Sequence, residues 1–146
     1  MKKKISVGII GFGRMGQNHA KVINNIKSCK LKFILEKKIK DIDQNFNGVK
    51  IYNKEKDFFN NKIDLLIIST TTDTHFYFVK IAIKNKIKKI FLEKPMANSF
   101  NNCLKIIDLA KKNKTSIRIN HQMEYMPAYK DMSKIINSKN LGGLVS

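Results

Sequence analysis

The chain begins with an apolar run, a glycine-rich turn and a helical pattern, in that order. Residues Ile5–Ile10 are apolar and rich in β-branched side chains, and Gly11–Gly16 fit the spacing G-x-G-x-x-G. A helical pattern follows from Arg14 to about Lys27. In this context the first glycine permits a tight turn, the second lets main chain approach a diphosphate, and the third lets the helix pack closely. The turn predicts a dinucleotide-binding unit; the alternative is a plain strand-to-helix turn that uses glycine.

Strand-like and helical patterns alternate along the rest of the chain. Further strands are expected over 31–35, 49–52, 64–69, 89–92 and 116–119. Helices are expected from an Asp73 or Thr74 cap to about Lys86, after a Ser99 cap, and after Pro127. This order favours an α/β fold, a doubly wound parallel sheet of the Rossmann type with both faces covered. The expected inward faces are Met15, His19, Val22, Ile23 and Ile26; Phe76, Val79, Ile81 and Ile83; Cys103, Leu104, Ile106, Ile107 and Ala110; and Met132, Ile135 and Ile136.

The net charge of +18 over 146 residues does not by itself indicate a nucleic-acid surface. Only Arg14 and Arg118 are arginines, and the 27 lysines are spread along the whole chain beside 16 asparagines and 22 isoleucines. Codons for these three residue types are A/T-rich, so genome bias explains them. A nucleic-acid surface would more often concentrate charge and use arginine. We expect no specific nucleic-acid partner, only weak attraction to polyanions at low salt.

Other features exclude several further classes. No apolar run approaches about 18 residues, so no membrane partner is expected. Lysines precede the first apolar run as in a signal peptide, but glycines and Arg14 interrupt it and no cleavage site follows. Cys29 and Cys103 have neither disulfide-framework nor metal spacing, so no metal site is expected and a cytoplasmic location is favoured.

An acidic residue stands where a dinucleotide site requires one. Glu36 follows Gly16 by 20 residues and directly follows the second expected strand. A carboxylate there would accept hydrogen bonds from both ribose hydroxyls and would repel a 2′-phosphate, which favours NAD. Lys37 and Lys38 come next and could receive that phosphate, so NADP stays open. The alternative for Glu36 is a solvated charge at a strand end.

Four ordered motifs resemble those of the Gfo/Idh/MocA oxidoreductases. The resemblance rests on Gly11–Gly16 with the following Asn18–Ala20, on Ser69–His75, on Glu93–Pro95, and on Asn120–Met123 followed by Pro127. It covers the chain from Ile5 to its last residue. Each motif follows an expected strand, and ligands of open α/β sheets bind at the carboxyl ends of the strands. The resemblance and these positions together assign cofactor binding to Gly11, Phe12, Gly13, Arg14, Met15, Gly16, Glu36, Ser69, Thr70, Thr71, Thr72, His75, Glu93 and Lys94.

Within this set, the hydroxyls of Ser69–Thr72 are expected beside the cofactor. The resemblance implies that His75 helps to shape the cofactor cleft; the alternative is an ordinary polar residue at a helix start. His121 could face a substrate, although a polar strand-end residue is the preferred interpretation. Gln122–Glu124 departs from the basic-aromatic pattern of relatives, so no substrate role is transferred to that segment.

Lys94 is the predicted catalytic residue. In the resembled family the lysine of this motif contacts the nicotinamide region and the reacting hydroxyl. Such a lysine can donate a hydrogen bond to a substrate oxygen or relay a proton. Pro95 biases Lys94 toward extended geometry, and Glu93 is expected to orient or restrain the ammonium. The alternative is a surface lysine before a turn proline.

The resemblance also implies an activity and a second domain. It implies an NAD(P)-dependent oxidoreductase that transfers hydride between nicotinamide and a carbinol or ketone carbon of a sugar or inositol. Residues 1–123 would form the dinucleotide-binding domain, and 124–146 would begin a truncated substrate domain, with 141–146 as its opening strand. A homo-oligomer is left open because relatives associate through that domain. The alternative function is a dinucleotide-binding module without catalysis.

Overall fold

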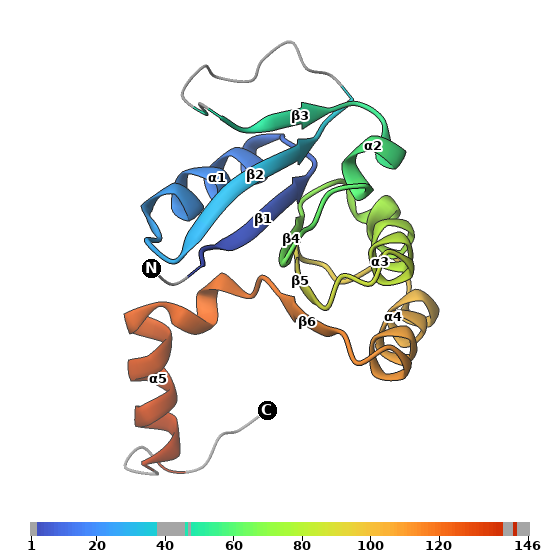
Figure 1. Cartoon of the computed structure of the whole chain (residues 1–146). Coiled ribbons are helices and arrows are strands. Elements are labelled where there is room, and N and C mark those ends of the chain that lie inside the picture. The colour runs from blue at the N-terminus through green and yellow to red at the C-terminus, as the bar shows by residue number, and fades with distance from the viewer. Residues whose placement is uncertain (1–2, 38–45, 47, 139–141, 143–146) are drawn as a thin grey trace.

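Six parallel strands form one sheet in the order β3-β2-β1-β4-β5-β6 (Figure 1). The structure is a computed structural model that describes residues 3–37, 46, 48–138 and 142. The strands are β1 (Ile5–Ile10), β2 (Cys29–Leu35), β3 (Lys50–Tyr52), β4 (Leu65–Ile68), β5 (Lys89–Leu92) and β6 (Ser116–Ile119). The α-helices are α1 (Arg14–Asn25), α2 (Glu55–Phe59), α3 (His75–Lys84), α4 (Phe100–Lys112) and α5 (Pro127–Asn137), with single 3-10 turns η2 (Thr72–Thr74) and η3 (Gln122–Tyr125).

The strand order confirms the predicted doubly wound sheet. The chain starts in the middle at β1, builds outward through β2 and β3, returns to β4, and then builds outward in the other direction. This reversal places a crevice just beyond the carboxyl ends of β1 and β4. We call the side of the sheet where all six strands end the carboxyl edge.

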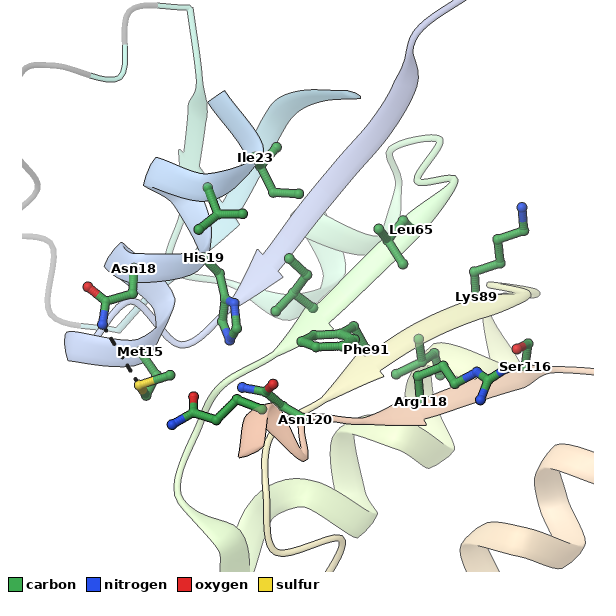
Figure 2. Close-up of a pocket in the computed structure, with 14 residues that line it drawn as sticks. Met15, Asn18, His19, Ile23, Leu65, Lys89, Phe91, Ser116, Arg118 and Asn120 are labelled. Atoms are coloured by element: carbon green, nitrogen blue, oxygen red, sulfur yellow. Dashed lines mark hydrogen bonds between the residues drawn. The ribbon is translucent and has the colours of Figure 1, made fainter. Parts of the chain in front are cut away.

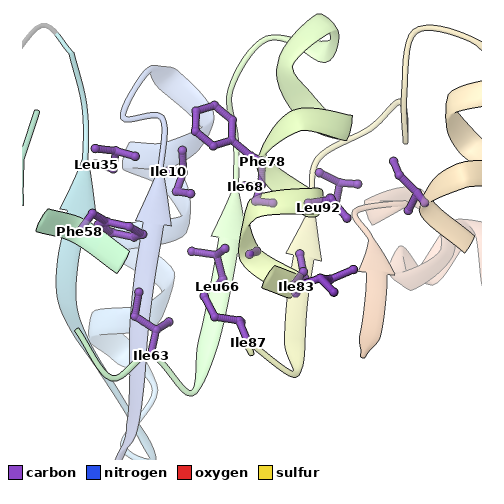
Figure 3. Packing of buried hydrophobic residues seen from close by; sticks show 14 residues of the cluster. Ile10, Leu35, Phe58, Ile63, Leu66, Ile68, Phe78, Ile83, Ile87 and Leu92 are labelled. Atoms are coloured by element: carbon purple, nitrogen blue, oxygen red, sulfur yellow. The ribbon is translucent and has the colours of Figure 1, made fainter. Parts of the chain in front are cut away.

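Alternating side chains divide the core between the two faces of the sheet. Val7 and Ile9 of β1 pack in a cluster with Ala20 and Ile23 of α1. Ile10, the next residue of β1, belongs to the opposite cluster, together with residues of α2, α3 and α4 (Figure 3). This period of two is what a strand buried on both faces produces. Figure 1 shows α1 on one side of the sheet and α2, α3 and α4 on the other.

The two faces are not equally covered in the described part of the chain. On the α1 side, residues of β4, β5 and β6 line an open cavity of about 600 Å³. The predicted cover of both faces is therefore confirmed on the side of α2–α4 and is incomplete on the side of α1.

Several predicted helix faces are wrong in part. Val22 of α1 and Leu104 of α4 are exposed, and Ile106 is the one buried residue of α4. The expected inward residues of α5, Met132, Ile135 and Ile136, are 58%, 48% and 42% exposed. An amphipathic pattern identifies an apolar face, but it does not show that a partner covers that face.

One helix start differs from expectation, and another agrees with it. Neither Asp73 nor Thr74 caps α3 with its side chain, because the chain first makes the 3-10 turn η2 and α3 begins at His75. Ser99 does cap α4, with its Oγ atom accepting a hydrogen bond from the Asn102 N–H at 3.2 Å.

The final segment stands apart from the sheet. The turn η3 connects β6 to α5, which lies away from the six strands in Figure 1. The division between 1–123 and 124–146 stays a prediction. The expected opening strand at 141–146 lies outside the described residues, apart from Gly142.

Candidate functional site

The three glycines of the turn meet three different physical demands. Gly11 has a φ of +84°, a left-handed conformation that favours glycine, and an added Cβ would lie 2.9 Å from the main chain of Ser69. Gly16 packs against the same turn, because an added Cβ there would lie 2.2 Å from the Gly11 carbonyl oxygen. The predicted tight turn and close helix packing are thus both observed.

Gly13 is the glycine that leaves space. It is the N-cap residue of α1, and no side chain caps the helix there. An added Cβ would find nothing within 4 Å. The first amides of an α-helix have no partner within the helix, and their dipoles attract anions. The open main chain at Gly13 therefore fits a diphosphate group.

Glu36 lies against this turn. Its Oε2 atom accepts a hydrogen bond from the main-chain N–H of Phe12 at 2.7 Å. Phe12 itself is 4% exposed and packs edge-on against Phe46, so its side chain belongs to the core. The arrangement brings the end of β2 to the turn after β1. A half-buried carboxylate in this place fits the hydroxyls of a ribose beside the diphosphate.

Ser69 and Thr70 join the carboxyl end of β4 to the same turn. The Ser69 hydroxyl donates a hydrogen bond to the carbonyl oxygen of Gly11 at 2.8 Å. The Thr70 hydroxyl accepts a hydrogen bond from the Thr74 hydroxyl at 2.7 Å. These two hydroxyls hold loops together, and their expected place beside a cofactor stays a prediction. Thr71 is exposed, and Thr72 begins η2.

His75 is fully buried and connects two loops of the carboxyl edge. Its Nδ1 atom lies 2.9 Å from the carbonyl oxygen of Pro95, and its Nε2 atom lies 3.1 Å from that of Thr70. A neutral imidazole has one N–H, so it can satisfy one of these oxygens fully. His75, the first residue of α3, is thus a structural link between the loops after β4 and β5, and its expected part in the cofactor cleft stays a prediction.

Glu93 forms a cluster that the sequence did not predict. Its Oε1 atom lies 2.6 Å from Nε2 of His19 and accepts from the Nδ2 group of Asn120 at 2.7 Å. Its Oε2 atom accepts from the main-chain N–H of Lys94 at 3.3 Å. The carboxylate is 5% exposed as a residue and therefore needs these partners. Glu93 thus holds the main chain of Lys94, and its expected effect on the Lys94 ammonium stays a prediction.

Lys94 itself is exposed at the carboxyl edge, next to this cluster. The peptide bond between Lys94 and Pro95 is cis. Arg14 is exposed as well, and Met15 is half-buried near the start of α1. His121 is exposed after β6, and its main-chain N–H donates to Ile119.

A first cavity lies between the carboxyl ends of β1, β2 and β4. We call it the β2–β4 cavity; its volume is about 330 Å³. Its floor is apolar, with Leu35 and Phe78 among its residues, and its rim is polar. The lining residues are Ile10, Gly11, Leu35, Glu36, Lys37, Asn53, Glu55, Thr70, Thr71, Thr74, Tyr77 and Phe78.

The second cavity is the one of about 600 Å³ on the α1 side of β4–β6 (Figure 2). His19 and Asn120 line its end at the carboxyl edge, whereas Lys89 and Ser116 line its opposite end. Figure 2 shows the His19 ring above Phe91, and the two ring centroids are 5.5 Å apart in an edge-on contact. His19 and Asn120 were missed as site residues. Both lie in segments that carry the family resemblance, Asn18–Ala20 and Asn120–Met123, but neither was assigned a role.

Two other classes of site are not found in the described residues. No group of three or more His, Cys, Asp or Glu side chains among them could hold a metal ion. Over residues 3–37, 46, 48–138 and 142, no helix combines the length and the apolar character needed to cross a membrane.

Comparisons with known proteins agree with this geometry. Residues 5–121 match the family model for Gfo/Idh/MocA proteins, described as an oxidoreductase family with an NAD-binding Rossmann fold. The chain is 27% identical over 147 residues to inositol 2-dehydrogenase of Salmonella typhimurium, covering 94% of this chain and 43% of that protein. It is 28% identical over 143 residues to inositol 2-dehydrogenase/D-chiro-inositol 3-dehydrogenase of Lactiplantibacillus plantarum, covering 93% of this chain and 41% of that protein.

Solved structures show the same fold. Myo-inositol 2-dehydrogenase from Lactobacillus plantarum superimposes with a TM-score of 0.83 at 25% identity, covering 98% of this chain and 44% of that chain. The apo scyllo-inositol dehydrogenase from Lactobacillus casei gives a TM-score of 0.86 at 20% identity, covering 97% of this chain and 44% of that one. The chain thus spans less than half the length of these relatives. Because the family model matches most of the sequence, this chain belongs to the Gfo/Idh/MocA oxidoreductase family and contains that family's NAD-binding Rossmann domain.

Proposed function

We propose that this chain binds a nicotinamide dinucleotide along the carboxyl edge of its sheet and serves hydride transfer to or from a small polyol. The single observation that carries the proposal is the uncapped start of α1 at Gly13, where an added Cβ would meet nothing within 4 Å. Here the glycines on either side are tightly packed, whereas the middle one is open.

Three regions of the edge would hold the dinucleotide. The turn Gly11–Gly16 would bind the diphosphate through main-chain amides, with Arg14 and Met15 at the first positions of α1. Glu36 would accept hydrogen bonds from a ribose, and the β2–β4 cavity, with its apolar floor, would take the adenine. The loops that carry Thr71, Thr72 and Lys94 would contact the rest of the dinucleotide.

When bound, the nicotinamide ring supplies or accepts a hydride, a chemistry that no amino-acid side chain provides. The contribution of this chain would be position and charge. Lys94 is exposed beside the Glu93 cluster, so its ammonium could donate a hydrogen bond to a carbinol or carbonyl oxygen and hold a proton there. Glu93, His19 and Asn120 would keep the main chain of Lys94 in place.

The substrate class rests on the relatives. Several similar curated proteins are named inositol 2-dehydrogenase, so a cyclic polyol or sugar is the proposed substrate. A second candidate, a dinucleotide-binding module without catalysis, is favoured by one observation: Lys94 is exposed in the described part of the chain. Hydride transfer normally takes place where water is excluded.

Fluorescence titration with NADH and NADPH tests the binding step. The wild-type chain should show saturable enhancement of nicotinamide fluorescence with one of the two. Gly13→Glu should abolish it, because a carboxylate would occupy the anion site, while circular dichroism stays native since the position has open space. Binding that survives Gly13→Glu, or no binding by the wild type, would overturn the proposal.

Coenzyme reduction with inositols and sugars tests the chemistry. The proposed role predicts that Lys94→Ala loses most of the hydride transfer but keeps NADH binding. Lys80→Ala is the matched control, because Lys80 is an exposed lysine on α3 that lines neither cavity. Binding without hydride transfer to any polyol would select the non-catalytic module instead.

A further inference from the structure

Two side chains at the rim of the β2–β4 cavity hold each other in place. The hydroxyl of Tyr77, on α3, donates a hydrogen bond to the Oε2 atom of Glu55, on α2, at 2.7 Å. The Tyr77 ring packs edge-on against Phe78, with ring centroids 5.1 Å apart, and Phe78 is buried. Glu55 therefore has a fixed carboxylate on a short helix rather than a freely moving one.

The charge at this cavity is opposite in sign to that of the chain. Among the described residues that line it, Glu36 and Glu55 are carboxylates and Lys37 is the cation. The chain as a whole carries +18. Glu36 is held by the Phe12 N–H and Glu55 by Tyr77, whereas Lys37 is exposed. The cavity is therefore lined by two positioned carboxylates and by one lysine, which is exposed.

We propose that Glu55, positioned by Tyr77, is a specificity residue that makes this site select NAD over NADP. This inference rests on the proposed function, because it concerns the same dinucleotide. The two coenzymes differ by one phosphate on the adenosine ribose. A phosphate monoester has a charge near −2 at pH 7, and like charges in one site repel each other. Glu36 alone would disfavour that phosphate, and Glu55 adds a second carboxylate to the same cavity.

The position of Tyr77 makes this effect specific. A carboxylate without a partner could turn into solvent and be screened within about 8 Å at physiological salt. The hydrogen bond to Tyr77 keeps the Glu55 charge at the rim. Tyr77 is 45% exposed and Glu55 is half-buried, so neither is part of the packed core, and we expect variants at both positions to keep the fold.

The test measures the dissociation constants of NADH and NADPH by fluorescence at low salt, with the full 146-residue chain. Glu55→Gln should tighten NADPH binding by about 3- to 10-fold and leave NADH within about 2-fold. Tyr77→Phe keeps the ring but loses the hydroxyl. It should therefore lower the ratio of the NADPH to the NADH dissociation constant, as Glu55→Gln does, but by a smaller factor. Asp57→Asn is the matched control, since it removes one charge from the same helix at an exposed position outside the cavity.

The outcomes separate this inference from the proposed function. The inference is supported if the wild type binds NADH and if the ratio of the NADPH to the NADH dissociation constant falls in Glu55→Gln and Tyr77→Phe but not in Asp57→Asn. NADH binding with an unchanged ratio in Glu55→Gln, or an equal shift in Asp57→Asn, overturns the inference and leaves the proposed function intact. An unchanged ratio in Tyr77→Phe overturns the role of the hydroxyl. A wild type that binds neither coenzyme overturns both.

Discussion

The Nε2 atom of His19 lies 2.6 Å from the Oε1 atom of Glu93, although 74 residues separate them in the sequence. The contact joins α1 to the loop after β5, and Asn120 extends it to the end of β6. Three segments of the carboxyl edge therefore share one carboxylate. A contact from each of these segments stabilises the buried Glu93 carboxylate.

Replacing His19 should weaken this cluster measurably. His19→Ala leaves the Glu93 Oε1 atom with Asn120 alone, and a buried charged group that loses a partner costs about 1–3 kcal/mol. Urea unfolding followed by circular dichroism measures the change. Asn18→Ala is the control, because Asn18 is exposed on the same helix. Equal stabilities of the two variants would show that the His19 contact contributes nothing.

The glycines of the turn should differ in their tolerance of a methyl group. Gly16→Ala would push a Cβ to 2.2 Å from the Gly11 carbonyl oxygen, which is main chain and cannot move freely. We expect a loss of about 1–3 kcal/mol in the free energy of unfolding. Gly13→Ala meets open space and should cost less than about 1 kcal/mol. The reverse order of stabilities in denaturant titrations would contradict this geometry.

The start of α4 depends on one side chain. The Ser99 Oγ atom accepts from the Asn102 N–H, so Ser99→Ala should destabilise the protein by about 1 kcal/mol. Ser99→Asp provides an equivalent acceptor and should retain the stability. Thermal or urea unfolding of the three proteins checks this. A Ser99→Ala protein as stable as the wild type would exclude a capping role.

Tyr77 should lose its proton at a higher pH than an ordinary tyrosine. The hydrogen bond to Glu55, followed by desolvation and by the negative charge of Glu55, raises the pKa of Tyr77 above 10.0. Because the folded state holds this proton more tightly, the stabilising contribution is complete below pH 10 and is lost as the pH rises through the raised pKa. The pKa of Tyr77 is measured by ultraviolet titration of tyrosinate, as the difference between the titration curves of the wild type and of Tyr77→Phe.

The control for this titration is Glu55→Gln. It removes the negative charge, so the pKa of Tyr77 should fall back toward its ordinary value. An identical titration of Tyr77 in the wild type and in Glu55→Gln would show that the two side chains do not interact in solution.

Strands and turns were the most predictable parts of this protein. Residues 89–92 and 116–119 form β5 and β6 with the expected bounds, and the glycine turn leads from β1 into α1. Continuous apolar runs bounded by turn residues identify buried strands locally. The short helix α2 was missed, because five residues contain too little periodicity to indicate a helix.

Side-chain partners were less predictable. Glu36 was expected at the cofactor and lies at the glycine turn, but its bond to the Phe12 N–H was not foreseen. The partners of Glu93, and the pair of Glu55 with Tyr77, join segments on different elements. No local spacing relates such residues.

The sequence by itself determined the positions of most strands and helices along the chain, the glycine turn and the acidic residue at the end of β2. It did so because backbone propensity, side-chain period and glycine conformation act over a few residues. Only the tertiary structure decided which polar groups meet at the carboxyl edge and which apolar faces stay open, such as that of α5. Those outcomes depend on the relative placement of distant elements, which is set by packing of the whole chain.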